Sequence, residues 1–129
     1  MFTLKQIKDA YDKVKTEADF AIYIQKLIDL GIKEYDSFIS DGRVVYYGDT
    51  DHKASTEKKY EQISVAATVS KERFIEYLVM HENGQTDYHT FCQQAAHCGI
   101  SKSRIDIVEM TCTYLSNEGD PIVIEKIPV

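Results

Sequence analysis

The sequence predicts an α+β domain in which two helical hairpins pack on a mainly antiparallel sheet. Apolar residues recur at helical spacing over residues 4–14, 17–30, 71–82 and 87–98. After each pair of helical segments the pattern changes to the alternation of strands. With 129 residues, 43% of them hydrophobic, the chain can bury a core of its own, so residues 1–129 are expected to form a single domain.

The first helical hairpin has clear start and stop signals. Thr3 is a predicted N-cap, and Gln6 completes a capping-box pattern. One apolar stripe follows, made of Leu4, Ile7, Ala10, Tyr11 and Val14. After Thr16-Glu17 a second helix is predicted to run to Leu30, with Gly31 as its left-handed C-terminal cap. Its expected inner side consists of Phe20, Tyr23, Ile24, Leu27 and Ile28.

Residues 35–47 are expected to form a β-hairpin around Asp41-Gly42, a strong turn signal. A two-residue turn would pair Ile39 with Val44 and Phe38 with Val45. Both faces would then carry apolar groups, which predicts a sheet covered on more than one side.

The segment 48–60 is polar and is expected to be a long loop, whereas 63–69 is expected to form a short third strand. Ser70 is a predicted cap for a helix over 71–82 that ends at Asn83-Gly84. The apolar residues of this helix cover more than one stripe, so it is either central or part of a partner interface.

The next helix is predicted to begin at Asp87 or Thr86 and to stop at Gly99. Strands are expected over 104–109, 110–115 and 122–127, with a turn over 116–120. Pro121 and Pro128 bracket the last strand, which favours an edge position.

The two halves share a pattern of two helices followed by strands, which suggests a helix-helix-strand-strand duplication. The matches at an offset of 68 residues are Asp19 and Asp87, Phe20 and Tyr88, Tyr23 and Phe91, Gln25 and Gln93, Gly31 and Gly99, Ile32 and Ile100, Ile39 and Ile107, Tyr46 and Tyr114. Against a duplication, the Asp41-Gly42 turn falls on Glu109-Met110, which carries no turn signal. Caps and glycine stops also recur by chance at helix-to-strand junctions.

Charge and cysteine usage exclude several classes of function. The net charge is -6 and the charges are interleaved, which argues against a nucleic-acid-binding surface. No signal peptide or membrane span is expected from the hydropathy pattern. Three cysteines without a C-x-x-C spacing favour free thiols in a reducing cytoplasm.

The helix at 87–98 concentrates histidines and cysteines, yet its periodicity favours a structural role. Cys92 falls on the apolar side, whereas His89, Gln93 and His97 follow the outer side. Residues eight apart on a helix are separated by roughly 12 Å, too far to share a metal ion. A zinc site would therefore need further ligands such as His81 or Cys112.

A thiol nucleophile needs an exposed cysteine in a positive environment. Cys92 is expected to be buried, Cys112 lies between threonines on a strand, and Cys98 lies at the negative end of a helix dipole. The segment 49–52, Asp-Thr-Asp-His, begins like a calcium loop but lacks the later ligands, so a solvated loop is expected.

Strand residues offer two further candidates. Glu34 and Asp36 share a strand face, where paired carboxylates are commonly exposed. Tyrosines suit a binding face or an oligomer interface, although half-buried packing is the commoner role of tyrosines on strands. Those on predicted strands are Tyr35, Tyr46, Tyr47 and Tyr114.

Four separated motifs resemble a small bacterial family, the YbcV-like family of unknown function, some of whose members are labelled phage envelope proteins. The motifs are Phe2-Thr3-Leu4-Lys5-Gln6-Ile7, Gly84-Gln85-Thr86-Asp87-Tyr88 with Phe91-Cys92, Met110-Thr111-Cys112-Thr113-Tyr114, and Glu125-Lys126-Ile127-Pro128. The resemblance implies a compact α+β domain that is often prophage-associated. It implies no activity, cofactor or catalytic residue.

The sequence thus supports two hypotheses and assigns no catalytic residue, cofactor or metal. The first is a non-enzymatic cytoplasmic domain, of prophage origin by resemblance, that binds a protein partner or forms a homodimer. It would use the tyrosine-bearing sheet or the helix at 71–82, and it would bind neither nucleic acid nor a membrane. The second is a small-molecule binder or enzyme that uses Cys112, His81 or His89 in a cleft between helices and sheet.

Overall fold

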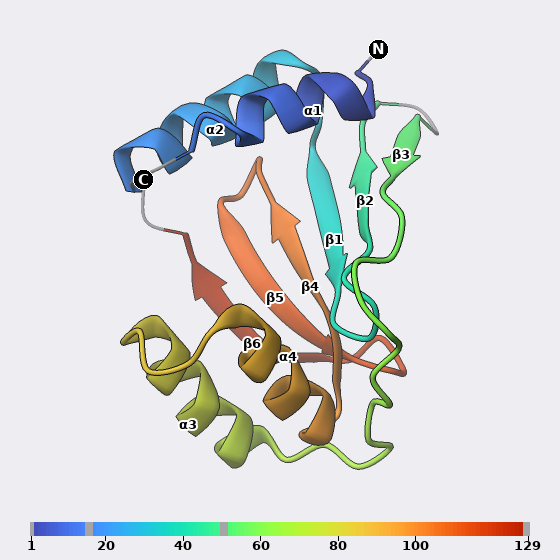
Figure 1. Cartoon of the computed structure of the whole chain (residues 1–129), viewed down its shortest axis with the longest axis vertical. Helices are drawn as coiled ribbons and strands as arrows, with labels where there is room; N and C mark the ends of the chain where they lie inside the picture. Colours follow the sequence, from blue (N-terminus) through green and yellow to red (C-terminus); the bar gives the residue numbers. More distant parts are fainter. Residues whose placement is uncertain (1, 15–16, 50–51, 128–129) are drawn as a thin grey trace.

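The computed structural model describes residues 2–14, 17–49 and 52–127, without the side chains of residues 17, 18 and 20. The predicted α+β class is confirmed: the described residues form four helices and a six-stranded antiparallel sheet (Figure 1). The helices are α1 (Leu4–Tyr11), α2 (Glu17–Asp29), α3 (Lys71–Glu82) and α4 (Tyr88–His97). The strands are β1 (Glu34–Phe38), β2 (Val44–Tyr47), β3 (Lys53–Ser55), β4 (Ile100–Asp106), β5 (Thr111–Ser116) and β6 (Pro121–Lys126).

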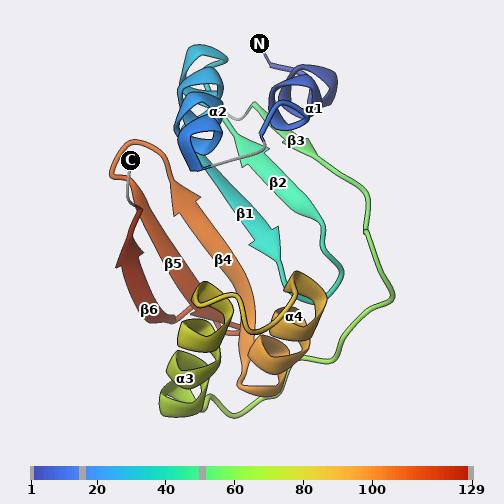
Figure 2. The same cartoon turned by 60° about the vertical axis from the view of Figure 1, so that its left-hand side comes forward.

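The strand order is β3-β2-β1-β4-β5-β6, so β1 and β4 form the centre of the sheet. Both helical pairs lie on the same face of it, α1 and α2 near one end of the strands and α3 and α4 near the other (Figure 2). Each pair covers its own hydrophobic core. Leu27 is the most buried residue of the first core, and Phe74 and Ile100 are fully buried in the second.

Local signals for helix ends are confirmed. Thr3 and Gln6 form the capping box, in which the Gln6 amide donates to Thr3 Oγ1 at 3.2 Å. Asp87 caps α4, and its Oδ1 accepts from the Thr90 amide at 2.7 Å. Gly31 and Gly99 both end helices at a φ of 88°. Ser70 precedes α3 as expected, but its side chain makes no capping hydrogen bond.

The register of the first hairpin differs from the prediction by two residues. Val44 pairs with Ser37 and Val45 with Asp36, so the turn spans residues 39–43. Ile39 leaves the hairpin because its side chain is buried in the second core and its amide donates to the Ser101 carbonyl at 2.9 Å. A shift of two residues keeps every side chain on its predicted face.

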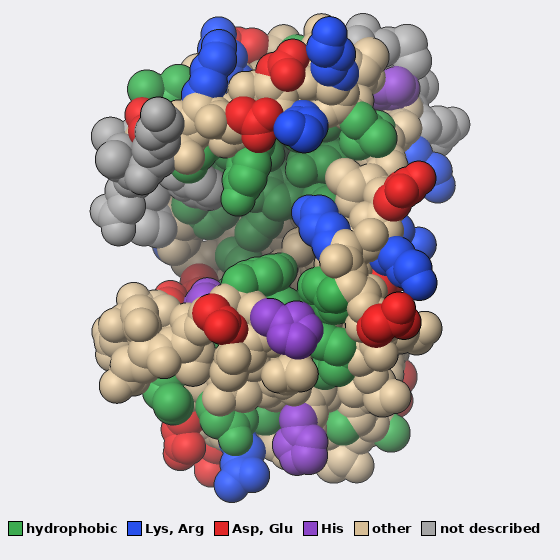
Figure 3. Space-filling view, viewed as in Figure 1, with side chains coloured by type: hydrophobic (Ala, Val, Ile, Leu, Met, Phe, Trp, Pro, Cys, Tyr) green, Lys and Arg blue, Asp and Glu red, His purple; other side chains and the backbone are tan. Residues whose placement is uncertain are grey.

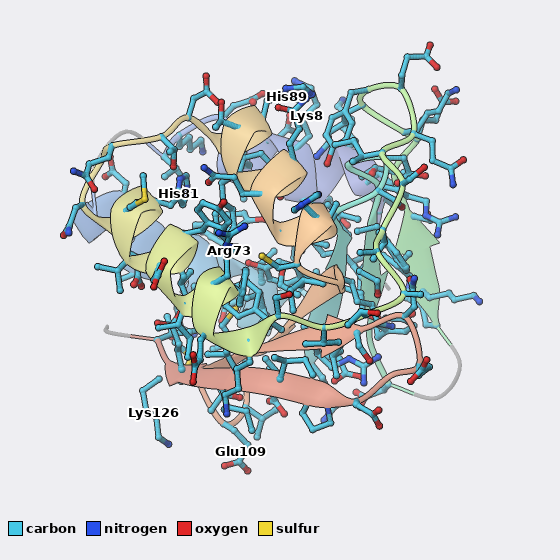
Figure 4. The ribbon with its side chains drawn as sticks, turned by 90° about the horizontal axis from the view of Figure 1, so that it is seen from below. Lys8, Arg73, His81, His89, Glu109 and Lys126 are labelled. Atoms are coloured by element: carbon cyan, nitrogen blue, oxygen red, sulfur yellow. The ribbon has the colours of Figure 1, made fainter. Side chains whose placement is uncertain are left out.

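The expectation that both faces of the sheet are covered is wrong. The face away from the helices carries the alternate residues of each strand, including Asp36, Phe38, Tyr47 and Arg104. No described helix packs on this face, and Figure 4 shows Lys126 projecting from it. Phe38 is shielded by the Arg43 guanidinium, which lies 4.3 Å above its ring.

Three segment predictions need correction. The expected loop at 48–60 contains β3, which adds to the sheet beside β2. The expected strand at 63–69 has no regular structure, since its amides bond to loop and helix carbonyls such as Ser40 and Ala96. The strand expected at 104–109 is β4, which starts at Ile100 directly after the Gly99 cap. Ile28, placed on the inner side of its helix, is exposed.

The offset of 68 residues holds in the hydrogen-bond registers of the sheet. Asp36 pairs with Arg104, its own counterpart 68 residues later. Tyr35 pairs with Tyr46, and their counterparts Ser103 and Tyr114 pair in turn. The structure therefore repeats two helices and three strands around an approximate twofold axis at the β1–β4 pair. A common origin of the two halves by duplication stays a prediction.

The turn that argued against the repeat supports it in the structure. Gly42 has a φ of 78°, and Met110, 68 residues later, is a non-glycine residue with a φ of 56°. The correspondence fails at one helix start, because Asp87 is a cap whereas Asp19 lies inside α2. The match of Phe20 with Tyr88 lies outside the described side chains.

Candidate functional site

A cleft of about 720 Å³ opens between α1, the β1–β2 part of the sheet and the start of α4. In Figure 3 it is visible as a hollow with a hydrophobic floor between the two helical pairs. Its volume is in the range of small-molecule sites in proteins. The cleft is therefore the candidate functional site.

Five tyrosines line this cleft. They come from four different elements and are Tyr11, Tyr23, Tyr35, Tyr46 and Tyr88. The Tyr35 and Tyr46 rings lie 5.3 Å apart as a cross-strand pair, and the Tyr11 ring meets Tyr23 edge-to-face at 5.6 Å. The cleft thus combines apolar rings with hydroxyl groups, a composition suited to recognising an organic molecule.

Depth separates the tyrosines into two groups. Tyr23 and Tyr46 are buried and Tyr35 is half-buried, whereas Tyr11 is 60% exposed and Tyr88 is 50% exposed. Burial raises the pKa of Tyr23, Tyr35 and Tyr46 above the ordinary tyrosine value, and it raises the pKa of Tyr88 to about 12. These four hydroxyls are therefore protonated and neutral at physiological pH.

The predicted tyrosine face is divided by the structure. Tyr35 and Tyr46 lie in the cleft, whereas Tyr47 points to the opposite face of the sheet. Tyr114 is packed in the second core, with its ring 5.0 Å from Phe74. The sequence analysis assigned Tyr11, Tyr23 and Tyr88 to helix packing, so it missed three of the five cleft tyrosines.

The histidines proposed for a catalytic cleft have other contacts. His81 lies with Nδ1 3.1 Å from both the carbonyl and hydroxyl oxygens of Thr86, and its ring stacks on Phe91 at 4.5 Å. His89 is exposed on α4 and meets the Tyr60 ring edge-to-face at 5.3 Å. Figure 4 shows the two histidines on different helices. Neither lines the cleft.

The three cysteines lack the environment of a reactive thiolate. Cys92 and Cys98 are fully buried, and burial raises the pKa of both thiols. Burial also raises the pKa of Cys112 to about 11, and the nearby Glu125 and Glu82 carboxylates act in the same direction. Cys112 lies beside Tyr114 on β5 and is not part of the cleft lining.

Metal-ligating side chains do not cluster in the part of the chain that the structure describes. No group of three or more His, Cys, Asp or Glu residues there is arranged to hold an ion. Of the calcium-like segment at 49–52, Thr50 and Asp51 lie outside the described residues. His52 lies with Nε2 3.1 Å from the Phe2 carbonyl oxygen, and Asp49 pairs with Lys33 at 3.2 Å.

Comparison with known proteins identifies the family and assigns no activity. A family model described as "Protein of unknown function (DUF1398)" matches residues 8–126. No curated protein matches the chain. Within the described ranges, no helix has the length and apolar character needed to cross a membrane. The matched segment includes every strand and nearly all of the cleft, and the chain belongs to the DUF1398 family of proteins of unknown function.

Proposed function

We propose that the protein binds a small organic molecule in the tyrosine-lined cleft and does not transform it. The observation that carries this proposal is a cleft of about 720 Å³ walled by five tyrosines from separate elements. Amphipathic rings of this kind recognise ligands through apolar contact and directed hydroxyl groups. The thiols and histidines that offered chemistry lie outside the lining.

A cleft-filling substitution tests the proposal. Leu4 lines the cleft from α1 and is 40% exposed, so Leu4→Trp places an indole in the cleft without disturbing a core. Ile28 on α2 is 45% exposed and lies outside the cleft lining, so Ile28→Trp is a matched control. Nile red, an uncharged apolar dye, reports binding by fluorescence.

Wild type and Ile28→Trp are expected to bind the dye with equal affinity, and Leu4→Trp at least about tenfold more weakly, a loss of about 1.4 kcal/mol. Equal binding by all three proteins, or none by wild type, would show that the cleft is not a binding site. Circular dichroism confirms that both variants are folded.

A second candidate function is self-association through α3, the helix expected to be central or interfacial. Phe74 and Leu78 face the core, whereas Ile75 and Val79, one turn apart, are exposed on the outer side. A second copy of the chain would cover these two side chains in a symmetric contact. Size-exclusion chromatography with light scattering should then give a dimer that Val79→Glu dissociates. A monomeric wild type across the micromolar range contradicts this candidate.

A further inference from the structure

The charged groups of the cleft lie at its rim. Lys8, Asp12 and Lys59 are the charged residues among the described lining, and all three are exposed. Lys8 and Asp12 pair with each other, Nζ to Oδ2 at 2.9 Å, one turn apart on and after α1. This pairing leaves the entrance polar and the interior without a fixed charge.

The deep wall consists of neutral hydroxyls and aromatic rings. Tyr23 and Tyr46 are buried there and hydrogen-bond to each other through their side chains. A charged ligand would lose its hydration against this wall and gain no opposite charge in return. An uncharged ligand avoids that cost.

A hydrogen-bonding anchor lies between the sheet and α4. Ser37 Oγ on β1 is 3.3 Å from Tyr88 Oη, and either atom can be the donor. A bond between two hydroxyls is ordinarily about 2.7–2.8 Å, so this one is long. Because Tyr88 is half exposed, both hydroxyls can turn toward a group on a bound molecule.

The tyrosine rings favour a flat partner. They already form a tilted pair, Tyr35 with Tyr46, and an edge-to-face pair, Tyr11 with Tyr23. Aromatic groups prefer such offset and edge-on contacts, so a planar ring system can extend either pair.

We propose that the ligand of this cleft is an uncharged, flat, ring-containing molecule with a hydroxyl or carbonyl group that hydrogen-bonds to Ser37 and Tyr88. This inference rests on the proposed binding function and defines the ligand class.

Three naphthalenes of similar size test the charge of the ligand: 2-naphthalenemethanol, 2-naphthylmethylammonium and 2-naphthoate. Calorimetric titration should show the alcohol binding at least about tenfold more tightly than either ion, since desolvating an ion costs more than about 1.4 kcal/mol. Equal or tighter binding of the ammonium compound would instead indicate cation–π recognition. Equal or tighter binding of the carboxylate would indicate recognition by a lysine. Either result overturns the ligand class and leaves the binding function intact.

The anchor is tested with the double variant Ser37→Ala/Tyr88→Phe, which removes two hydroxyls and keeps both shapes. Its affinity for 2-naphthalenemethanol should fall by about five- to tenfold, as expected for a lost hydrogen bond. Its affinity for 2-methylnaphthalene, which lacks the hydroxyl, should be unchanged. An equal loss for both compounds overturns the anchor. If none of the four compounds distinguishes wild type from Leu4→Trp, the binding function itself fails.

Discussion

Asp36 is the residue that departs most from its expected environment. An exposed strand carboxylate was predicted, yet its side chain is fully buried at the centre of the sheet. Arg104 Nε and a terminal guanidinium nitrogen lie 2.7 and 2.9 Å from its two oxygens, and Lys102 Nζ lies 3.0 Å away. Because Asp36 and Arg104 face each other across β1 and β4, this ion pair joins the two halves.

Replacing Asp36 with asparagine should destabilise the protein by about 3 kcal/mol, because two partly buried cations lose their counter-charge. The measurement is urea unfolding followed by circular dichroism. Asp12→Asn is the control: its pair with Lys8 is mostly exposed, so no measurable change is expected. Equal effects of the two substitutions would contradict the structural importance of Asp36.

The contribution of Asp36 should depend on pH. Burial acts to raise the pKa of Asp36, but the hydrogen bonds from Arg104 and Lys102 outweigh it and hold that pKa below its ordinary value. The stabilisation is therefore complete above the unfolded-state pKa of about 3.9 and is lost as pH falls through the folded-state value. The stability difference between wild type and Asp36→Asn should shrink accordingly in acid.

At the scale of elements, the two halves provide a matched pair of helix ends. Gly31 and Gly99 have the same φ of 88°, but an added Cβ meets nothing within 4 Å at Gly31. At Gly99 it would lie 2.9 Å from the Thr68 carbonyl oxygen and 3.0 Å from the Val69 Cα. The irregular segment 63–69 is thus held close against the end of α4.

Gly31→Ala should cost about 1 kcal/mol from the left-handed backbone alone. Gly99→Ala should cost about 3 kcal/mol, because the backbone of Thr68 and Val69 must also move. Thermal unfolding of both variants measures the difference. Similar costs would show that the contact with 68–69 yields easily.

At the scale of the whole molecule, the two cores exchange isoleucines. Ile39 follows β1 but is buried in the second core, and Ile107 follows β4 but is buried in the first. Their amides donate reciprocally, Ile39 to Ser101 at 2.9 Å and Ile107 to Lys33 at 3.0 Å. Each half therefore completes the core of the other.

Ile39→Ala should cost about 2–5 kcal/mol and should loosen the half to which it does not belong in sequence. Amide hydrogen exchange should accelerate more in α3 and α4 than in α2. Ile107→Ala should give the opposite pattern. Faster exchange confined to the half that carries the substitution would contradict this exchange of core residues.

The cleft also belongs to the whole molecule, because the repeat opens only on one side. In the second half, Phe74 fills the space between α3 and the sheet, with its ring 5.0 Å from Tyr114 and 6.0 Å from Phe91. In the first half, α1 buries only Ile7, and the counterparts Tyr46 and Tyr23 line open space. No periodicity in the sequence distinguishes these two outcomes.

The sequence by itself determined the α+β class, the helix ends at Thr3, Gly31, Asp87 and Gly99, and the inward position of Cys92, because caps and apolar stripes act within a few residues. Only the tertiary structure decided the hairpin register, the lack of a strand at 63–69, the burial of Asp36 and the assembly of the tyrosine cleft. Each of these depends on contacts between residues distant in the chain, such as Ile39 with the second core and Tyr88 with Ser37. Local pattern carries no information about which distant partner such residues will meet.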